Sequence, residues 1–122
     1  MGYELRMERP APLTFAELAT VLGQAGFEFR GSQESGEVLG RHGDGVHAIA
    51  VWNGNLSGTP ASDWQVAQLA RMAALLSARL VGEDGESYAL RDGMVEQLNG
   101  STAYEFGKLD EILAAGPALW SR

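Results

Sequence analysis

The sequence predicts an α+β fold of the ferredoxin-like type, in which two main helices cover one face of an antiparallel sheet and a short C-terminal helix follows. Segments with the two-residue periodicity of strands alternate with two segments of helical periodicity. Asn-Gly and Asp-Gly pairs, which suit the positive φ angles of tight turns, recur between the expected strands. Because 122 residues is the length of one typical domain, residues 1–122 are expected to form a single domain.

The first part of the chain is expected to form a strand, a helix and a second strand. Residues 3–7 alternate apolar and polar side chains, as a half-buried strand does. Thr14 and Glu17 have the spacing of a capping box, which begins a helix over residues 14–25. Residues 27–30 then return to alternation, so the chain re-enters the sheet directly after the helix.

The segment Gly31–Gly45 is expected to be mainly a loop. It contains five glycines and few large apolar side chains, which leaves room for one short strand around residues 37–39. The β-rich stretch 46–52 follows and ends at Asn53-Gly54, the pair best suited to a hairpin turn. A strong strand is therefore expected at 46–52, with a short one after the turn.

The longest helix is expected in the second half of the chain. Its start is either Thr59-Pro60 or Ser62 with Gln65, and both alternatives fit the signals of a helix N-terminus. Apolar residues then recur at helical spacing as far as Leu76. A short helix near the end of the chain is expected to stop at Gly116-Pro117.

Three carboxylates, those of Glu83, Asp84 and Glu86, surround Gly85 between two expected strand arms. Asp-Gly is what a tight turn requires, so a solvated turn is the simplest interpretation. Calcium loops spread their ligands over about 12 residues, and glycosidase carboxylates face each other across a cleft at about 5 to 10 Å, so the turn matches neither site. We expect these carboxylates, with Trp52 as an aromatic anchor, to bind a partner, although core packing is the alternative for the tryptophan.

His42, Asp44 and His47 form the one cluster that contains histidine. These side chains could hold zinc or iron if the loop folded around the ion and Glu37 or the acidic turn supplied a fourth ligand. However, their spacing matches no metal motif, and the chain has no cysteine. We therefore expect no metal and no cofactor.

The charge balance favours a basic protein as the partner. Sixteen acidic and nine basic residues give a net charge of −7, and the arginines are scattered along the chain. Nucleic acid is not expected as a direct ligand, because phosphate binding needs clustered basic residues. Neither a signal peptide nor an apolar stretch of roughly 18 residues is present, so we expect a cytoplasmic protein without membrane contact.

Residues 64–88 read W-x-V-x-x-L-A-x-M-A-x-x-L-x-A-x-L-V-G-E-D-G-E-x-Y. This stretch resembles the helix and acidic hairpin of small acidic bacterial proteins found in toxin-immunity gene neighbourhoods. The resemblance covers about a fifth of the chain and includes no catalytic motif. It implies a small cytosolic protein that binds another protein.

The leading functional hypothesis is a non-enzymatic protein-binding module, such as an immunity or antitoxin-like inhibitor that masks a basic surface with carboxylates. A second hypothesis is a small-molecule-binding regulatory module of ferredoxin-like fold, acting as a dimer with its ligand near Gly31–Gly45. A third is a metal-dependent enzyme built on His42, Asp44 and His47. The sequence does not decide the oligomeric state, and a homodimer is one alternative.

Overall fold

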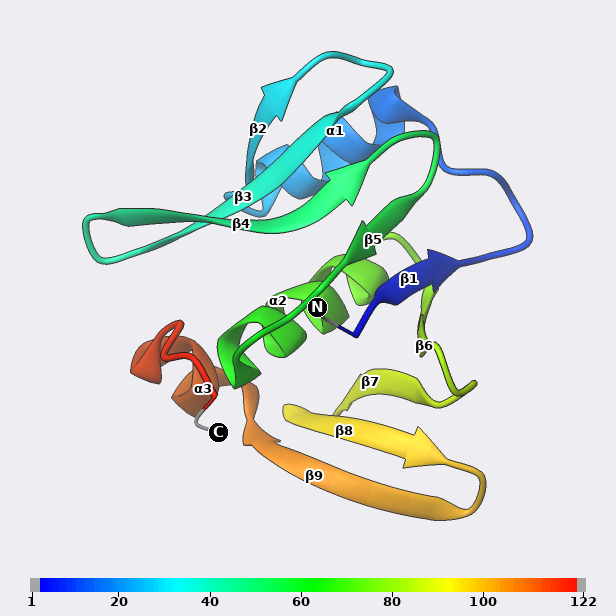
Figure 1. The fold of residues 1–122 in the computed structure, drawn as a ribbon, viewed down its shortest axis with the longest axis vertical. Coiled ribbons are helices and arrows are strands. Elements are labelled where there is room, and N and C mark those ends of the chain that lie inside the picture. Colours follow the sequence, from blue (N-terminus) through cyan, green and yellow to red (C-terminus); the bar gives the residue numbers. More distant parts are fainter. Residues whose placement is uncertain (1–2, 121–122) are drawn as a thin grey trace.

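A computed structural model describes residues 3–120 and places nine strands of this range in one antiparallel sheet, accompanied by three helices (Figure 1). In chain order the elements are β1 (Leu5–Glu8), α1 (Phe15–Gln24), β2 (Glu28–Gly31), β3 (Gly36–His42), β4 (Gly45–Trp52), β5 (Leu56–Gly58), α2 (Asp63–Leu75), β6 (Arg79–Gly82), β7 (Ser87–Arg91), β8 (Met94–Asn99), β9 (Thr102–Lys108) and α3 (Leu109–Ala115). The prediction of a ferredoxin-like sheet with two main helices is therefore wrong.

The order of the strands is β2-β3-β4-β5-β1-β6-β7-β8-β9. One series of hairpins runs from the β2 edge inward to β5, and a second runs from β6 outward to the β9 edge. The N-terminal strand β1 joins the two series, because Leu5 is paired with Gly58 of β5 on one side and with Gly82 of β6 on the other. Residues 5–8 thus occupy the centre of the sheet (Figure 1).

The glycine-rich segment is the first source of the error. Instead of a loop with one short strand, it contains the seven-residue strand β3. Gly40 lies in this strand where the sheet approaches α2, and a Cβ atom there would be 2.5 Å from Ile49 Cδ1 and 3.2 Å from Trp64 Cη2. Glycine is therefore present because of close packing, whereas in the sequence it indicates a turn.

The C-terminal hairpins are the second source of the error. Asp92 and Gly93 have φ angles of 52° and 76°, as a two-residue type I′ turn requires at both central positions. Gly100, with a φ of 65°, begins the next two-residue turn. These turns connect β7, β8 and β9, so the sheet continues for two strands beyond the acidic hairpin.

Both main helices are confirmed, together with their caps. The Thr14 hydroxyl accepts a hydrogen bond from the Glu17 N–H at 3.2 Å. The Ser62 hydroxyl accepts one from the Gln65 N–H at 3.2 Å, which decides between the two expected starts of α2. α2 is the longest helix of the described residues, and none of the helices between residues 3 and 120 is long and apolar enough to cross a membrane.

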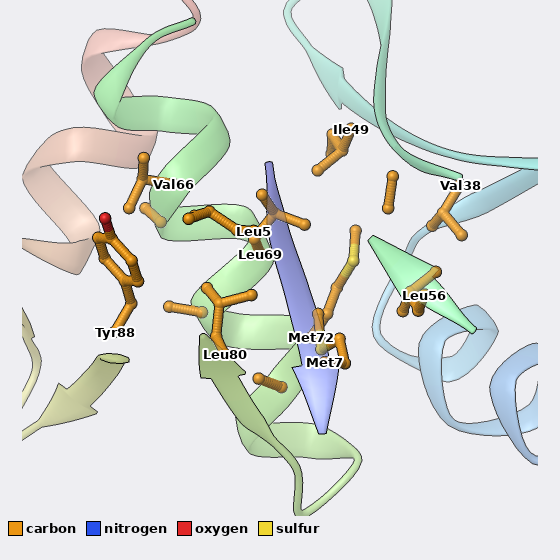
Figure 2. Close-up of a cluster of buried hydrophobic side chains, with 14 of the residues drawn as sticks. Leu5, Met7, Val38, Ile49, Leu56, Val66, Leu69, Met72, Leu80 and Tyr88 are labelled. Carbon is orange, nitrogen blue, oxygen red and sulfur yellow. The ribbon is translucent and has the colours of Figure 1, made fainter. Parts of the chain in front are cut away.

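The core lies between α2 and the centre of the sheet. Figure 2 shows Leu5 and Met7 of β1 beside Leu69 and Met72 of α2, and all four side chains are buried. α1 contacts β2 and α2, while α3 contacts α2 and β9, so the three helices together cover the sheet from one half to the other.

Candidate functional site: the acidic β6–β7 hairpin

The acidic turn between β6 and β7 is a tight hairpin. The Gly82 N–H donates to the Glu86 carbonyl at 2.8 Å, and the Gly85 N–H donates to the Gly82 carbonyl at 3.1 Å. Gly85 has a φ of 85°, in the left-handed region that favours glycine. The expected turn is confirmed, and the side chains of Glu83 and Asp84 are exposed at its tip.

The third carboxylate of the turn is not solvated. Glu86 is only 6% exposed, and its carboxylate accepts hydrogen bonds from the Tyr3 hydroxyl at 2.5 Å and the Tyr88 hydroxyl at 2.8 Å. The Asp84 N–H donates to the same carboxylate at 3.2 Å and to the Tyr3 oxygen at 2.9 Å. A Cβ atom at Gly82 would overlap the Glu86 carboxylate, so a glycine is needed beneath it.

This network keeps the carboxylate charged and the phenols neutral. Burial by itself raises the pKa of Glu86, but the hydrogen bonds from Tyr3, Tyr88 and the backbone N–H groups together outweigh it, and the resulting pKa lies below the usual value. Burial and the hydrogen bond to Glu86 raise the pKa of Tyr3 to about 12, and the same two causes raise the pKa of Tyr88. The network ties the N-terminal segment to the base of the hairpin.

The exposed tip includes one acidic residue that the sequence did not suggest. The Glu4 N–H donates to the Glu83 carboxylate at 2.7 Å across 79 positions of the chain. Glu4, Glu83 and Asp84 are all exposed, and we call these three residues the acidic patch. Within residues 3–120, none of the three forms an ion pair with a basic side chain.

Five arginine side chains elsewhere in the fold are ion-paired with glutamates. The pairs within the described residues are Arg6–Glu8, Arg9–Glu17, Arg30–Glu37, Arg41–Glu28 and Arg91–Glu96. Four of them lie within one strand or between neighbouring strands. Each pair neutralises one acidic and one basic side chain, so the negative field of the protein comes from unpaired groups such as those of the acidic patch.

Trp52 does not lie beside the acidic patch. Its side chain is 5% exposed, and the indole N–H donates to the Gln33 carbonyl at 2.8 Å. Trp52 is therefore packed in the core, which was the alternative to a role as an aromatic anchor, and a partner could not reach it in this structure. Trp120, by contrast, is 48% exposed, and its indole N–H donates to the Asp63 carboxylate at 2.8 Å.

The two histidines face the indole ring of Trp64. The ring centroids of His42 and His47 lie 6.4 Å and 5.5 Å from the Trp64 centroid, both edge-on. His42 Nε2 also lies 3.2 Å from the Ala114 carbonyl oxygen, while Asp44 is exposed in the β3–β4 turn. Among residues 3–120, no three histidine, aspartate or glutamate side chains are arranged to hold a metal ion.

Comparisons of the chain with protein-family models, with curated protein sequences and with solved structures gave no match.

Proposed function

We propose that this chain is a cytoplasmic, non-enzymatic protein-binding module that covers a basic surface of its partner with carboxylates, in the manner of immunity or antitoxin-like inhibitors. The observation that carries the proposal is the acidic patch of Glu4, Glu83 and Asp84, exposed on a hairpin whose base is fixed by the Glu86 network.

A fixed acidic patch suits association better than it suits folding. Exposed carboxylates are screened by water and salt, so they contribute little to the stability of the protein. Opposite charge on a partner increases the rate of encounter and orients the two surfaces. The tight turn and the Tyr3–Glu86 hydrogen bond hold the patch in place before binding, which lowers the entropy lost on association.

We do not propose the alternative of a small-molecule-binding module. That hypothesis assumed a ferredoxin-like fold and a loop at Gly31–Gly45 beside which the ligand would bind. That segment instead contains the whole of β3 and the turns on either side of it.

The test is to isolate the partner from the native host and measure its association with the double variant Glu83→Gln/Asp84→Asn. The matched control is Glu34→Gln/Asp44→Asn, which removes the same charge from two exposed turns outside the acidic patch. We expect the patch variant to associate at least several-fold more slowly at low salt and to show a weaker salt dependence than the control. Equal association rates for the two variants would exclude the acidic patch from the interface.

A further inference from the structure

The two edges of the sheet differ in a way that bears on binding. β2 is a four-residue edge strand, and its Glu28 and Arg30 form cross-strand ion pairs with Arg41 and Glu37. Short, charged edge strands are a common protection against unwanted strand pairing. β9 is seven residues long and its first four residues are exposed, and no such ion pair protects it within residues 3–120. It lies at the outer boundary of the sheet in Figure 1.

The hairpin register identifies the backbone groups on the open side of β9. Asn99 and Thr102 are paired across a two-residue turn, so their backbone groups bond to each other. Because bonding alternates along an antiparallel ladder, Tyr104 also bonds inward to Gln97. The N–H and C=O groups of Ala103 and Glu105 therefore point away from the sheet.

Side chains beside this edge indicate the chemistry of a suitable strand. Glu105 is exposed and lies opposite Glu96 in the ladder. Glu96 is buried and ion-paired with Arg91, so Glu105 is the carboxylate that this face offers to a partner. On the other face, Tyr104 is 61% exposed and packs edge-on against Phe106 at 5.2 Å between ring centroids. The edge thus combines open backbone groups with one exposed carboxylate on one face and an exposed aromatic side chain on the other.

We infer that β9 binds an extended, basic segment of a partner protein, which adds a further antiparallel strand to the sheet. The segment would exchange backbone hydrogen bonds with Ala103 and Glu105, place a lysine or arginine near Glu105 and an apolar side chain on Tyr104. A second copy of the chain fits this edge less well, because each copy carries a net charge of −7 and its own Glu105. The inference rests on the proposed function, since it names the form in which a basic partner is bound.

The first test uses a short, capped peptide of alternating lysine and valine as the probe. We expect it to shift the amide NMR signals of β9 and to slow hydrogen exchange at Ala103 and Glu105 at least tenfold at saturation. A peptide with glutamate in place of lysine, and a lysine peptide N-methylated at alternate residues, should each bind at least tenfold more weakly. Equal binding of all three peptides, or no protection of these two amides, would overturn the inference. So would concentration-dependent protection without peptide, because it would assign the edge to a second copy.

Two variants of β9 separate backbone pairing from charge. Ala103→Pro removes an outward N–H without removing a bond to β8, and it should abolish peptide binding, whereas Ala103→Val should retain it. Glu105→Lys leaves the backbone unchanged and should reverse the preference toward the glutamate peptide. If Ala103→Pro binds the lysine peptide as the wild type does, the inference fails, whether or not Glu83→Gln/Asp84→Asn impairs association with the partner. The proposed function fails separately, if that double variant associates normally.

Discussion

At the residue scale, Glu86 and its neighbours Glu83 and Asp84 are chemically alike but have different roles. Glu83 and Asp84 lie at the tip of the turn, where water solvates them. Glu86 directly follows Gly85, and its carboxylate is enclosed by the hydroxyls of Tyr3 and Tyr88. The carboxylate accepts three hydrogen bonds, from Tyr3, Asp84 and Tyr88, and these replace the water that a buried charge loses.

Changing Glu86→Gln should lower the free energy of unfolding by about 1 to 3 kcal/mol, because an amide is a weaker acceptor for two phenols and its NH₂ group lacks a partner there. Urea denaturation measures the change. Glu83→Gln is the control and should alter stability by less than about 0.5 kcal/mol. Equal stability of the two variants would contradict the role of the buried network.

The same network predicts how stability depends on pH. Tyr3 has an ordinary pKa of 10.0 in the unfolded chain and about 12 in the fold, so its contribution is complete below pH 10.0 and is lost as the pH rises through about 12. The pKa of Glu86 is lowered from 4.5, so its contribution is present above pH 4.5 and is lost as the pH falls through the lower folded value. Urea denaturation from pH 8 upward should show a shallower alkaline decline for Tyr3→Phe than for the wild type, and identical declines would contradict the argument.

The sequence predicted the exposed half of the site but not the buried half. The Asp-Gly pair was sufficient to predict that Glu83 and Asp84 are exposed, because the geometry of a turn depends on local sequence. Tyr3 and Glu4 meet the hairpin only because β1 pairs with β6. A contact made across most of the chain leaves no periodicity that could be recognised in one sequence.

At the scale of single elements, the hairpin turn depends on one backbone conformation. Gly85→Val should lower the free energy of unfolding by about 1 kcal/mol or more, because Gly85 has a φ of 85° that a β-branched residue adopts only with strain. A Cβ atom there would meet no neighbouring atom within 4 Å, so the cost comes from the backbone alone. Asn tolerates this conformation better, so Gly85→Asn should cost clearly less in the same urea titration. Equal costs for the two substitutions would disprove a backbone origin.

Helices were predicted more accurately than strands because their signals are local. The caps at Thr14 and Ser62 fix the starts of α1 and α2 from residues three positions apart. β9 gave no such signal, because five of its seven residues are exposed and no alternating burial pattern results. β3 was predicted too short, at residues 37–39, because its glycines resemble those of a loop.

At the scale of the whole molecule, the two series of hairpins share a single strand. Leu5 is 1% exposed and is paired on both sides, so its side chain belongs to the packing of both halves. Leu5→Ala should lower the free energy of unfolding by about 2 to 5 kcal/mol and retain a single urea transition. Leu119, which is 73% exposed, is the matched control, and Leu119→Ala should cost less than about 0.5 kcal/mol. A second transition in Leu5→Ala would show that the halves unfold independently.

The order of the strands in the sheet could not be predicted from the sequence, because β1 pairs with strands that are distant in the chain. Every strand of the two series follows its neighbour in sequence, but β1 lies between β5 and β6 rather than beside β2. Hydrophobic periodicity locates strands but does not say which pairs form, and pairings between distant segments are the least constrained by local signals.

The central position of β1 also determines when the protein can fold during synthesis. The ribosome makes β1 before both of its neighbours, and the pairing of Leu5 with Gly82 joins residues 77 positions apart. Until β6 has left the ribosome, β1 has one unpaired side, and α2 has a face that β6 does not yet cover. Closing so long a loop is entropically costly and slow. The sheet is therefore completed late, and a chaperone that binds extended segments with uncovered apolar side chains would find such a segment in β1.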